Sequence, residues 1–435
     1  TRRGSYAAYL HITHPEIEEF LDGRKPTGGD TNRRFLNLHH GVVISDSFME
    51  TIHRATREGG FDDSWELIDP HTKEVKKVVS ARALWVKILQ NRMETGEPYV
   101  MYEDAVNNDL PEFQQRKGLY VNHSNLCSEI TLPTNDERTA VCCLSSVNLE
   151  YFDEWQNHPS FIPDLVRFLD NVLESFINNA PDQLEKAKYS AYRERSIGLG
   201  TMGFHAYLQK LGIPFEGLSA SNINYGIFEH IKTQAMEETR KLAVERGACP
   251  DDDSCQVRNA HLLAIAPNAS SSIICGNTSP SIEPFRANAY TQKTKSGSFL
   301  QKNKFLEKVL EKYEMNDEKT WRDIVTNKGS VQHLTFLTDE EKDVFKTAVE
   351  INQSWLIEHA SQRQQFICQS QSLNLFFPPD VSKKDLHNVH MLAWAKNLKT
   401  LYYLRSEAIS RADTVSNEVK REIIFEQQDC LSCEG

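Results

Sequence analysis

A thiol, an amide and a carboxyl group stand close together in the segment Asn125-Leu126-Cys127-Ser128-Glu129. In an extended chain, side chains two residues apart point to the same side, so we expect Asn125, Cys127 and Glu129 to face one bound molecule. An amide, a sulfur and a base at one place predict redox or radical chemistry on a polar substrate. A second thiol, Cys142, follows along the chain. Taken alone, the segment fits better with a Cys127 that is simply a small buried hydrophobe, which is the commoner role of cysteine.

Small hydroxyl residues follow the apolar stretch that ends at Ala266. The segment Pro267-Asn268-Ala269-Ser270-Ser271-Ser272 leaves backbone amides accessible to an anion, as phosphate sites at strand ends do. In isolation, a Ser-rich turn that caps a helix is the simpler interpretation. The segment therefore indicates a phosphate site only if other motifs agree.

The end of the chain carries two further pairs of reactive residues. Cys430 and Cys433 form a Cys-x-x-Cys pair, and no histidine lies in this tail. Zinc would need two more ligands, so a redox dithiol is preferred over a structural metal site. Tyr402 and Tyr403 lie in the last apolar stretch, where we expect one buried ring and one ring at an interface rather than a redox role.

The segment Gly198-Leu199-Gly200-Thr201-Met202-Gly203 matches the glycine pattern of dinucleotide-binding proteins. That fingerprint needs an apolar strand before it, and Tyr192-Arg193-Glu194-Arg195-Ser196 stands there instead. We therefore expect the glycines to permit close packing and a tight entry into a helix, and we do not expect nicotinamide binding.

Composition limits the class of protein. The chain has 435 residues, of which 39% are hydrophobic and 25% charged, and it has no apolar run long enough to span a bilayer. The net charge of -12 argues against direct nucleic-acid binding as the main role. Nine cysteines without a signal peptide suit free thiols in a reducing cytoplasm.

Strand-length apolar stretches alternate with helical periodicity, and this pattern is typical of an α/β fold. The expected strands are 41–45, 99–102, 144–149, 262–266 and 400–404, and the expected longer helices are 161–189, 219–246 and 338–361. We expect a catalytic domain over 1–412 and a mobile redox tail over 413–435. The start, Thr1 to Leu10, runs from a basic loop into a strand and looks like the middle of a domain.

Together the motifs resemble, in their order, the large catalytic subunit of class I (Ia) ribonucleotide reductase, and the sequence is most similar to the T4-like bacteriophage type. The resemblance covers nearly the whole chain but only the C-terminal part of that subunit, as from a split gene. In this alignment Arg2 and Arg3 are a remnant of the effector loop. The motifs are Asn125 to Glu129, Ala140-Val141-Cys142, Pro267 to Ser271, Ser281-Ile282-Glu283-Pro284, Lys399 to Tyr403 and the pair Cys430/Cys433.

The resemblance implies the family's ten-stranded α/β barrel of two halves, with Cys127 at the tip of a finger loop through its centre. Because the N-terminal portion of the subunit is absent from this sequence, we expect the first strands and the effector and activity regions to be missing. The barrel would then be incomplete without an N-terminal partner and would leave strand edges exposed.

The resemblance also implies a reaction: ribonucleoside diphosphates are reduced to deoxyribonucleoside diphosphates for DNA synthesis. A thiyl radical on Cys127 takes the 3′ hydrogen, Glu129 acts as general base and Asn125 holds the substrate hydroxyls. Cys142, with a cysteine outside this chain, delivers the reducing equivalents; the adjacent Cys143 leaves this assignment open by one residue.

Other residues receive supporting roles from the same resemblance. Tyr402 and Tyr403 conduct the radical, and Cys430 and Cys433 re-reduce the active-site disulfide. The substrate phosphates are held by Asn268, Ala269, Ser270 and Ser271, with Arg286 as an additional contact. Asn268 stands where relatives often carry a hydroxyl or charged residue, so the first phosphate contact stays open.

The resemblance also implies the cofactors, effectors and partner proteins. The chain itself binds no cofactor or metal, a diiron-tyrosyl small subunit supplies the radical, and ATP or deoxynucleotide effectors bind mainly to the missing N-terminal polypeptide. Thioredoxin or glutaredoxin is the reductant, and the large subunits form a dimer. Three alternatives stay open: a glycyl-radical reductase, which needs a C-terminal glycyl loop that is not evident here, a cobalamin-dependent (class II) reductase, and an inactive assembly or scaffold fragment.

Overall fold

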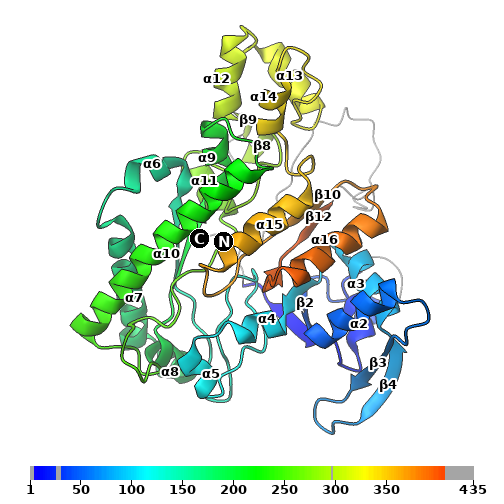
Figure 1. Cartoon of the computed structure of the whole chain (residues 1–435), viewed down its shortest axis with the longest axis vertical. Helices are drawn as coiled ribbons and strands as arrows, with labels where there is room; N and C mark the ends of the chain where they lie inside the picture. Colours follow the sequence, from blue (N-terminus) through cyan, green and yellow to red (C-terminus); the bar gives the residue numbers. More distant parts are fainter. Residues whose placement is uncertain (1–3, 26–30, 295–296, 407–435) are drawn as a thin grey trace.

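The computed structural model describes residues 4–25, 31–294 and 297–406 and has a mixed α/β architecture (Figure 1). Arg2, Arg3, Cys430 and Cys433 lie outside the described residues, as does the whole expected tail. No helix in the described part combines the length and the apolar character needed to cross a membrane.

A four-stranded sheet forms the first half of the core. Its strands lie in the order β1 (Ala7–His11), β2 (His39–Ile44), β5 (Tyr99–Tyr102) and β11 (Thr400–Leu401). The first three are parallel and β11 is antiparallel to β5. Strand β5 is buried along its whole length, as expected for a parallel strand covered on both faces. The sheet thus brings the chain's end beside its beginning.

A second parallel group contains the glycine motif. Strand β6 (Leu144–Asn148) pairs with β7 (Gly198–Met202), and single bridges join Leu199 to Leu263 and Ile265 to Gln371. The expected strand 262–266 therefore exists only as isolated bridges. A Cβ added to Gly200 would lie 2.5 Å from the Ala264 carbonyl oxygen, which confirms the close-packing role of these glycines.

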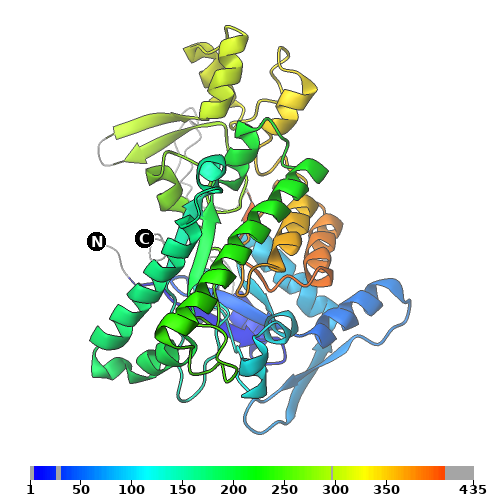
Figure 2. The same ribbon diagram turned by 60° about the vertical axis from the view of Figure 1, so that its left-hand side comes forward.

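Two long helices, α7 (Phe161–Asn179) and α10 (Leu218–Arg246), lie side by side over the second group of strands (Figure 2). The prediction of one helix over 161–189 is wrong, because the helix stops at Ala180 before Pro181 and α8 (Glu185–Glu194) follows. The predicted helix 338–361 is likewise two helices, α14 (Asp339–Val344) and α15 (Gln353–Gln364), the second capped by Asn352.

Two peripheral units project from the core (Figure 1). One is the hairpin of β3 (Ser64–Ile68) and β4 (Val75–Ser80), and the other packs β8 (Ala289–Thr294) and β9 (Gly297–Lys302) with three helices around its own apolar cluster. The remaining elements are α1 (Ile17–Asp22), η1 (Thr31–Arg33), α2 (Asp46–Arg57), α3 (Ala81–Thr95), α4 (Glu103–Asn108), α5 (Glu112–Arg116), η2 (Leu149–Tyr151), α6 (Phe152–Trp155), η3 (Asp182–Leu184), α9 (Phe204–Lys210), α11 (Ala269–Ile274), α12 (Lys304–Lys312), α13 (Glu318–Thr326), β10 (Leu375–Phe377), α16 (Lys383–Ala395) and β12 (Leu404–Ser406).

The expected α/β class is confirmed, whereas a closed barrel is not visible in the described residues. Their strands form separate sheets, the largest of four strands, with β10 and β12 as a further parallel pair. The predicted strand 400–404 is broken, because β11 ends at Leu401 and β12 begins at Leu404. This break has consequences for the two tyrosines that lie within it.

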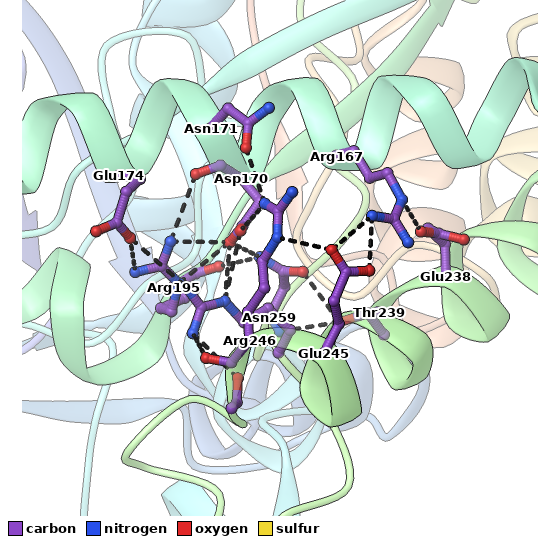
Figure 3. A network of polar contacts seen from close by, with 12 residues as sticks. Arg167, Asp170, Asn171, Glu174, Arg195, Glu238, Thr239, Glu245, Arg246 and Asn259 are labelled. Carbon is purple, nitrogen blue, oxygen red and sulfur yellow. Dashed lines mark hydrogen bonds and ion pairs between the residues drawn. The ribbon is translucent and has the colours of Figure 1, made fainter.

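A charged network fixes α7 against its neighbours (Figure 3). Asp170 is fully buried, and its carboxylate accepts from Arg195 Nη2 at 3.0 Å, Arg246 Nη1 at 3.1 Å and Arg258 Nε at 3.3 Å. Burial alone would raise the pKa of Asp170, but the guanidinium groups of Arg195 and Arg258 outweigh it and lower that pKa. Three arginines from different segments thus converge on one helix.

Candidate active site

Cys127 lies in a tight turn and is completely buried. The backbone of Ser128 is left-handed (φ 67°), its N–H donates to the Asn125 carbonyl at 3.3 Å, and the Asn125 side-chain oxygen accepts from Ile130 N at 3.2 Å. The prediction of an extended segment is therefore wrong, because the Asn125 side chain closes the loop on itself. Tyr9 of β1 donates to the Asn125 carbonyl at 2.9 Å and ties this turn to the sheet.

Cys127 shares one buried cluster with Tyr99, Tyr402 and Tyr403. The ring centroids of Tyr402 and Tyr403 are 4.3 Å apart, and the Tyr99 ring lies 4.8 Å from Tyr402 and 5.0 Å from Tyr403. We expected one of the paired rings at an interface, but in this chain both are buried, with 2% and 6% exposure. The structure thus brings the thiol and both predicted relay tyrosines together.

The break between β11 and β12 explains how adjacent tyrosines reach the same cluster. The chain leaves β5 at Leu401 and joins β10 at Leu404, so Tyr402 and Tyr403 do not alternate across one sheet. Tyr402 N donates to the Leu373 carbonyl at 2.9 Å, and Tyr403 N donates to Asn374 Oδ1 at 3.0 Å.

The phenols of Tyr99 and Tyr403 are neutral. Burial, followed by the charge of Glu97, raises the pKa of both Tyr99 and Tyr403. A neutral phenol releases an electron together with its proton, so these rings are suited to hydrogen-atom exchange rather than to ionic chemistry.

Glu129 is buried beside the turn and is held by a serine that sequence reasoning missed. Ser372 Oγ lies 2.5 Å from the Cys127 carbonyl oxygen, to which it donates, and 3.3 Å from Glu129 Oε2. The Ser370 N–H also donates to the Glu129 carbonyl at 2.9 Å. Residues 370–374 therefore contact both the turn at Cys127 and the segment that carries Tyr402 and Tyr403. Its only sequence signal is a run of small polar residues before an apolar strand.

The two adjacent cysteines occupy different environments. Cys143 packs into the main apolar core, whereas Cys142 is exposed. Surrounding protein atoms, and then the charge of Glu129, raise the pKa of Cys142 to about 11. Cys142 is therefore an accessible, protonated thiol that feels the charge of Glu129, whereas Cys143 is buried.

The predicted phosphate segment forms the start of α11. Asn268 has a left-handed backbone (φ 53°), and its side-chain nitrogen donates to Ser146 Oγ at 3.0 Å and to the Ala266 carbonyl at 3.0 Å. Its side chain therefore holds the loop itself, while Ser270 and Ser271 are half-buried. The guanidinium carbon of Arg286 lies 5.9 Å from the centroid of the Phe376 ring.

Comparison with known proteins shows the family of this chain. The family described as ribonucleotide reductase, barrel domain, matches residues 1–254 and 253–404. The chain is 45% identical to the ribonucleoside-diphosphate reductase large subunit of Invertebrate iridescent virus 3, over 100% of this chain and 77% of the relative. It is 51% identical to the protein of the same name from Invertebrate iridescent virus 6, over 96% of this chain and 79% of the relative.

A solved structure agrees. The α subunit of the class Id ribonucleotide reductase of Actinobacillus ureae matches with a TM-score of 0.81 at 36% identity, over 93% of this chain and 71% of that one. The chain therefore belongs to the ribonucleotide reductase family. Within it, the chain groups with the large subunits, oxidoreductases that act on ribonucleoside diphosphates and have a small-subunit partner. These relatives are viral and so support the viral context of the expected T4-like bacteriophage type, although they come from iridescent viruses of invertebrates. The comparisons do not favour the class II or scaffold alternatives.

Proposed function

We propose that Cys127 carries the thiyl radical that starts reduction of a ribonucleoside diphosphate. The observation that carries this proposal is the single buried cluster of Cys127, Tyr402 and Tyr403. A thiyl radical removes the 3′ hydrogen of the substrate and returns it at the end, so sulfur is a reversible carrier. A buried site protects such a radical from water.

The radical reaches Cys127 through Tyr403 and then Tyr402. The small subunit, with a diiron-tyrosyl centre as the proposed source, oxidises Tyr403. Tyr402 then gives a hydrogen atom to the Tyr403 radical and Cys127 gives one to the Tyr402 radical, so the radical moves inward as the hydrogen atoms move outward. Contact between the two rings and the neutral phenol of Tyr403 support transfer between them.

Glu129 then accepts the proton of the substrate 3′-hydroxyl as general base. The Asn125 amide oxygen already closes the turn, so its NH₂ group is the part that donates to substrate hydroxyls. Ser372, within reach of Glu129 Oε2, keeps the carboxylate oriented. Backbone amides of the loop, with Ser270 and Ser271, hold the diphosphate, while Asn268 positions that loop and Arg286 lies nearby.

Cys142 supplies a proton and one of the electrons that reduce the substrate. As a protonated thiol it gives its proton to the departing 2′-hydroxyl, which leaves as water, and it closes a disulfide with a second thiol that supplies the other electron. Cys430 and Cys433 reopen this disulfide by exchange and are recharged by thioredoxin or glutaredoxin in the cytoplasm. The large subunits act as a dimer whose effectors are ATP and deoxynucleotides.

Replacement of Cys127 by serine tests the proposal. Serine keeps the shape of the side chain but cannot form a comparable radical, so the Cys127→Ser enzyme with its small subunit should bind substrate and form no deoxynucleotide. The exposed Cys255 provides the control, and Cys255→Ser should retain normal turnover. Deoxynucleotide formation by Cys127→Ser at the rate of the control would refute the radical assignment.

A further inference from the structure

Three residues from outside the predicted motifs converge on the hydroxyl of Tyr403. His39 begins β2, and its Nδ1 lies 2.7 Å from Glu97 Oε1 and 3.3 Å from the Tyr403 phenolic oxygen. Glu97 stands just before β5, and its side chain is completely buried. Arg24 follows α1 and reaches the same carboxylate.

The donors around Glu97 determine which ring nitrogen of His39 carries the proton. Arg24 Nη2 donates to Oε1 at 3.1 Å, Arg24 Nε lies 3.1 Å from Oε2, and the His40 backbone N–H donates to Oε2 at 2.9 Å. A carboxylate in this setting only accepts hydrogen bonds. The hydrogen-bond network therefore assigns a proton to His39 Nδ1, which donates to Glu97.

Nδ1 carries one hydrogen, so its contact with the Tyr403 oxygen at 3.3 Å is the longer arm of a three-centre bond whose shorter arm, of 2.7 Å, goes to Glu97. Other groups also surround this phenol: Arg405 lies over its ring at 4.2 Å from the centroid, and Tyr99 and Tyr402, whose rings pack against it, also form side-chain hydrogen bonds with it. The ring of His39 meets Tyr403 edge-on, with an interplanar angle of 79°. His39 Nδ1 is thus placed to donate to the oxygen of Tyr403.

We propose that His39, held by Glu97 and Arg24, is a positioning residue whose Nδ1–H, shared with Glu97, also bonds to the oxygen of Tyr403 during radical transfer. A phenoxyl radical has lost its own proton and can only accept hydrogen bonds, so a fixed N–H donor stabilises the radical on Tyr403. The donor also fixes the oxygen where Tyr402 can exchange with it. This inference rests on the proposed radical path through Tyr403.

His40 offers a matched control on the same strand. Its side chain points to the opposite face of β2, where the ring stacks on Phe20 with centroids 4.2 Å apart. His40→Phe preserves that stacking and leaves the backbone bond to Glu97 intact. His39→Asn retains an N–H near the position of Nδ1, whereas His39→Leu removes it.

The experiment places 3-aminotyrosine, which is oxidised more easily than tyrosine, at position 403 of the assembled enzyme. High-field electron paramagnetic resonance then reads the largest g value of its radical, which falls when the oxygen accepts a hydrogen bond. His39→Leu should raise this g value, whereas His39→Asn and His40→Phe should leave it near that of the parent. In enzymes with natural Tyr403, His39→Leu should lower turnover about tenfold, the factor expected for one lost hydrogen bond, and His39→Asn should restore most of it.

Two results separate this inference from the proposed function. A radical at position 403 whose g value is the same in the parent and in His39→Leu overturns the role of His39 and leaves the radical path intact. Absence of any radical at position 403 in the parent overturns the path itself, and the inference with it.

Discussion

Two polar regions with buried centres, one at Asp170 and one at Cys127, use opposite electrostatics. Around Asp170, arginine side chains pair with one carboxylate, and the pKa of that carboxyl is lowered. Around Cys127, the phenols of Tyr99 and Tyr403 are kept neutral, and their pKa values are raised. Paired charges hold α7 against its neighbours, whereas a neutral phenol such as that of Tyr403 retains the hydrogen that radical transfer needs. Burial alone therefore does not indicate function; the protonation state of the buried group does.

The largest effect on stability should come from removing the charge at the centre of the first region. Asp170→Ala leaves three arginines without their shared partner, and we expect the free energy of unfolding to fall by about 3–5 kcal/mol. The exposed pair of Asp253 with Arg116 is the control, for which Asp253→Ala should cost about 0–1 kcal/mol. Urea denaturation measures both, and equal costs would contradict the structural role.

The same region has a predictable response to acid. Because the pKa of Asp170 is lower in the folded state than in the unfolded chain, its contribution is present above the unfolded value and is lost as the pH falls through the folded value. The difference in stability between the parent and Asp170→Ala should therefore shrink as the solution becomes strongly acidic.

A smaller effect, on rate rather than on stability, is expected in the second region. Ser372→Ala removes the hydroxyl that reaches both Cys127 and Glu129, so kcat should fall about tenfold while KM for the diphosphate changes little. Ser372→Thr keeps a hydroxyl and should recover part of the rate. Ser190 is also buried and donates to a buried carboxylate, that of Glu194 at 3.0 Å, so Ser190→Ala controls for loss of packing. A similar loss of kcat in both alanine variants would make Ser372 merely structural.

The alternation of apolar stretches was sufficient to predict the α/β class, whereas the link of Cys127 with Tyr402 and Tyr403 was predicted only by the resemblance to the reductase family. The local backbone was harder, because the turn at Cys127 depends on a side-chain bond of Asn125 and the break at Tyr402 on a change of strand partner. His39 and Ser372 were missed because their partners are distant in sequence, 364 residues away for Tyr403 and 243 for Glu129. Such contacts appear only when the sheets assemble.

The relay is tested most directly by two tyrosine substitutions in the same cluster. Tyr402→Phe and Tyr99→Phe each remove one buried phenolic hydroxyl and keep the ring, but in this account only Tyr402 conducts the radical to Cys127. With the small subunit and a reductant present, deoxynucleotide formation is the measurement. The account predicts no product from Tyr402→Phe and near-normal turnover from Tyr99→Phe. Turnover by Tyr402→Phe at the rate of Tyr99→Phe would contradict it.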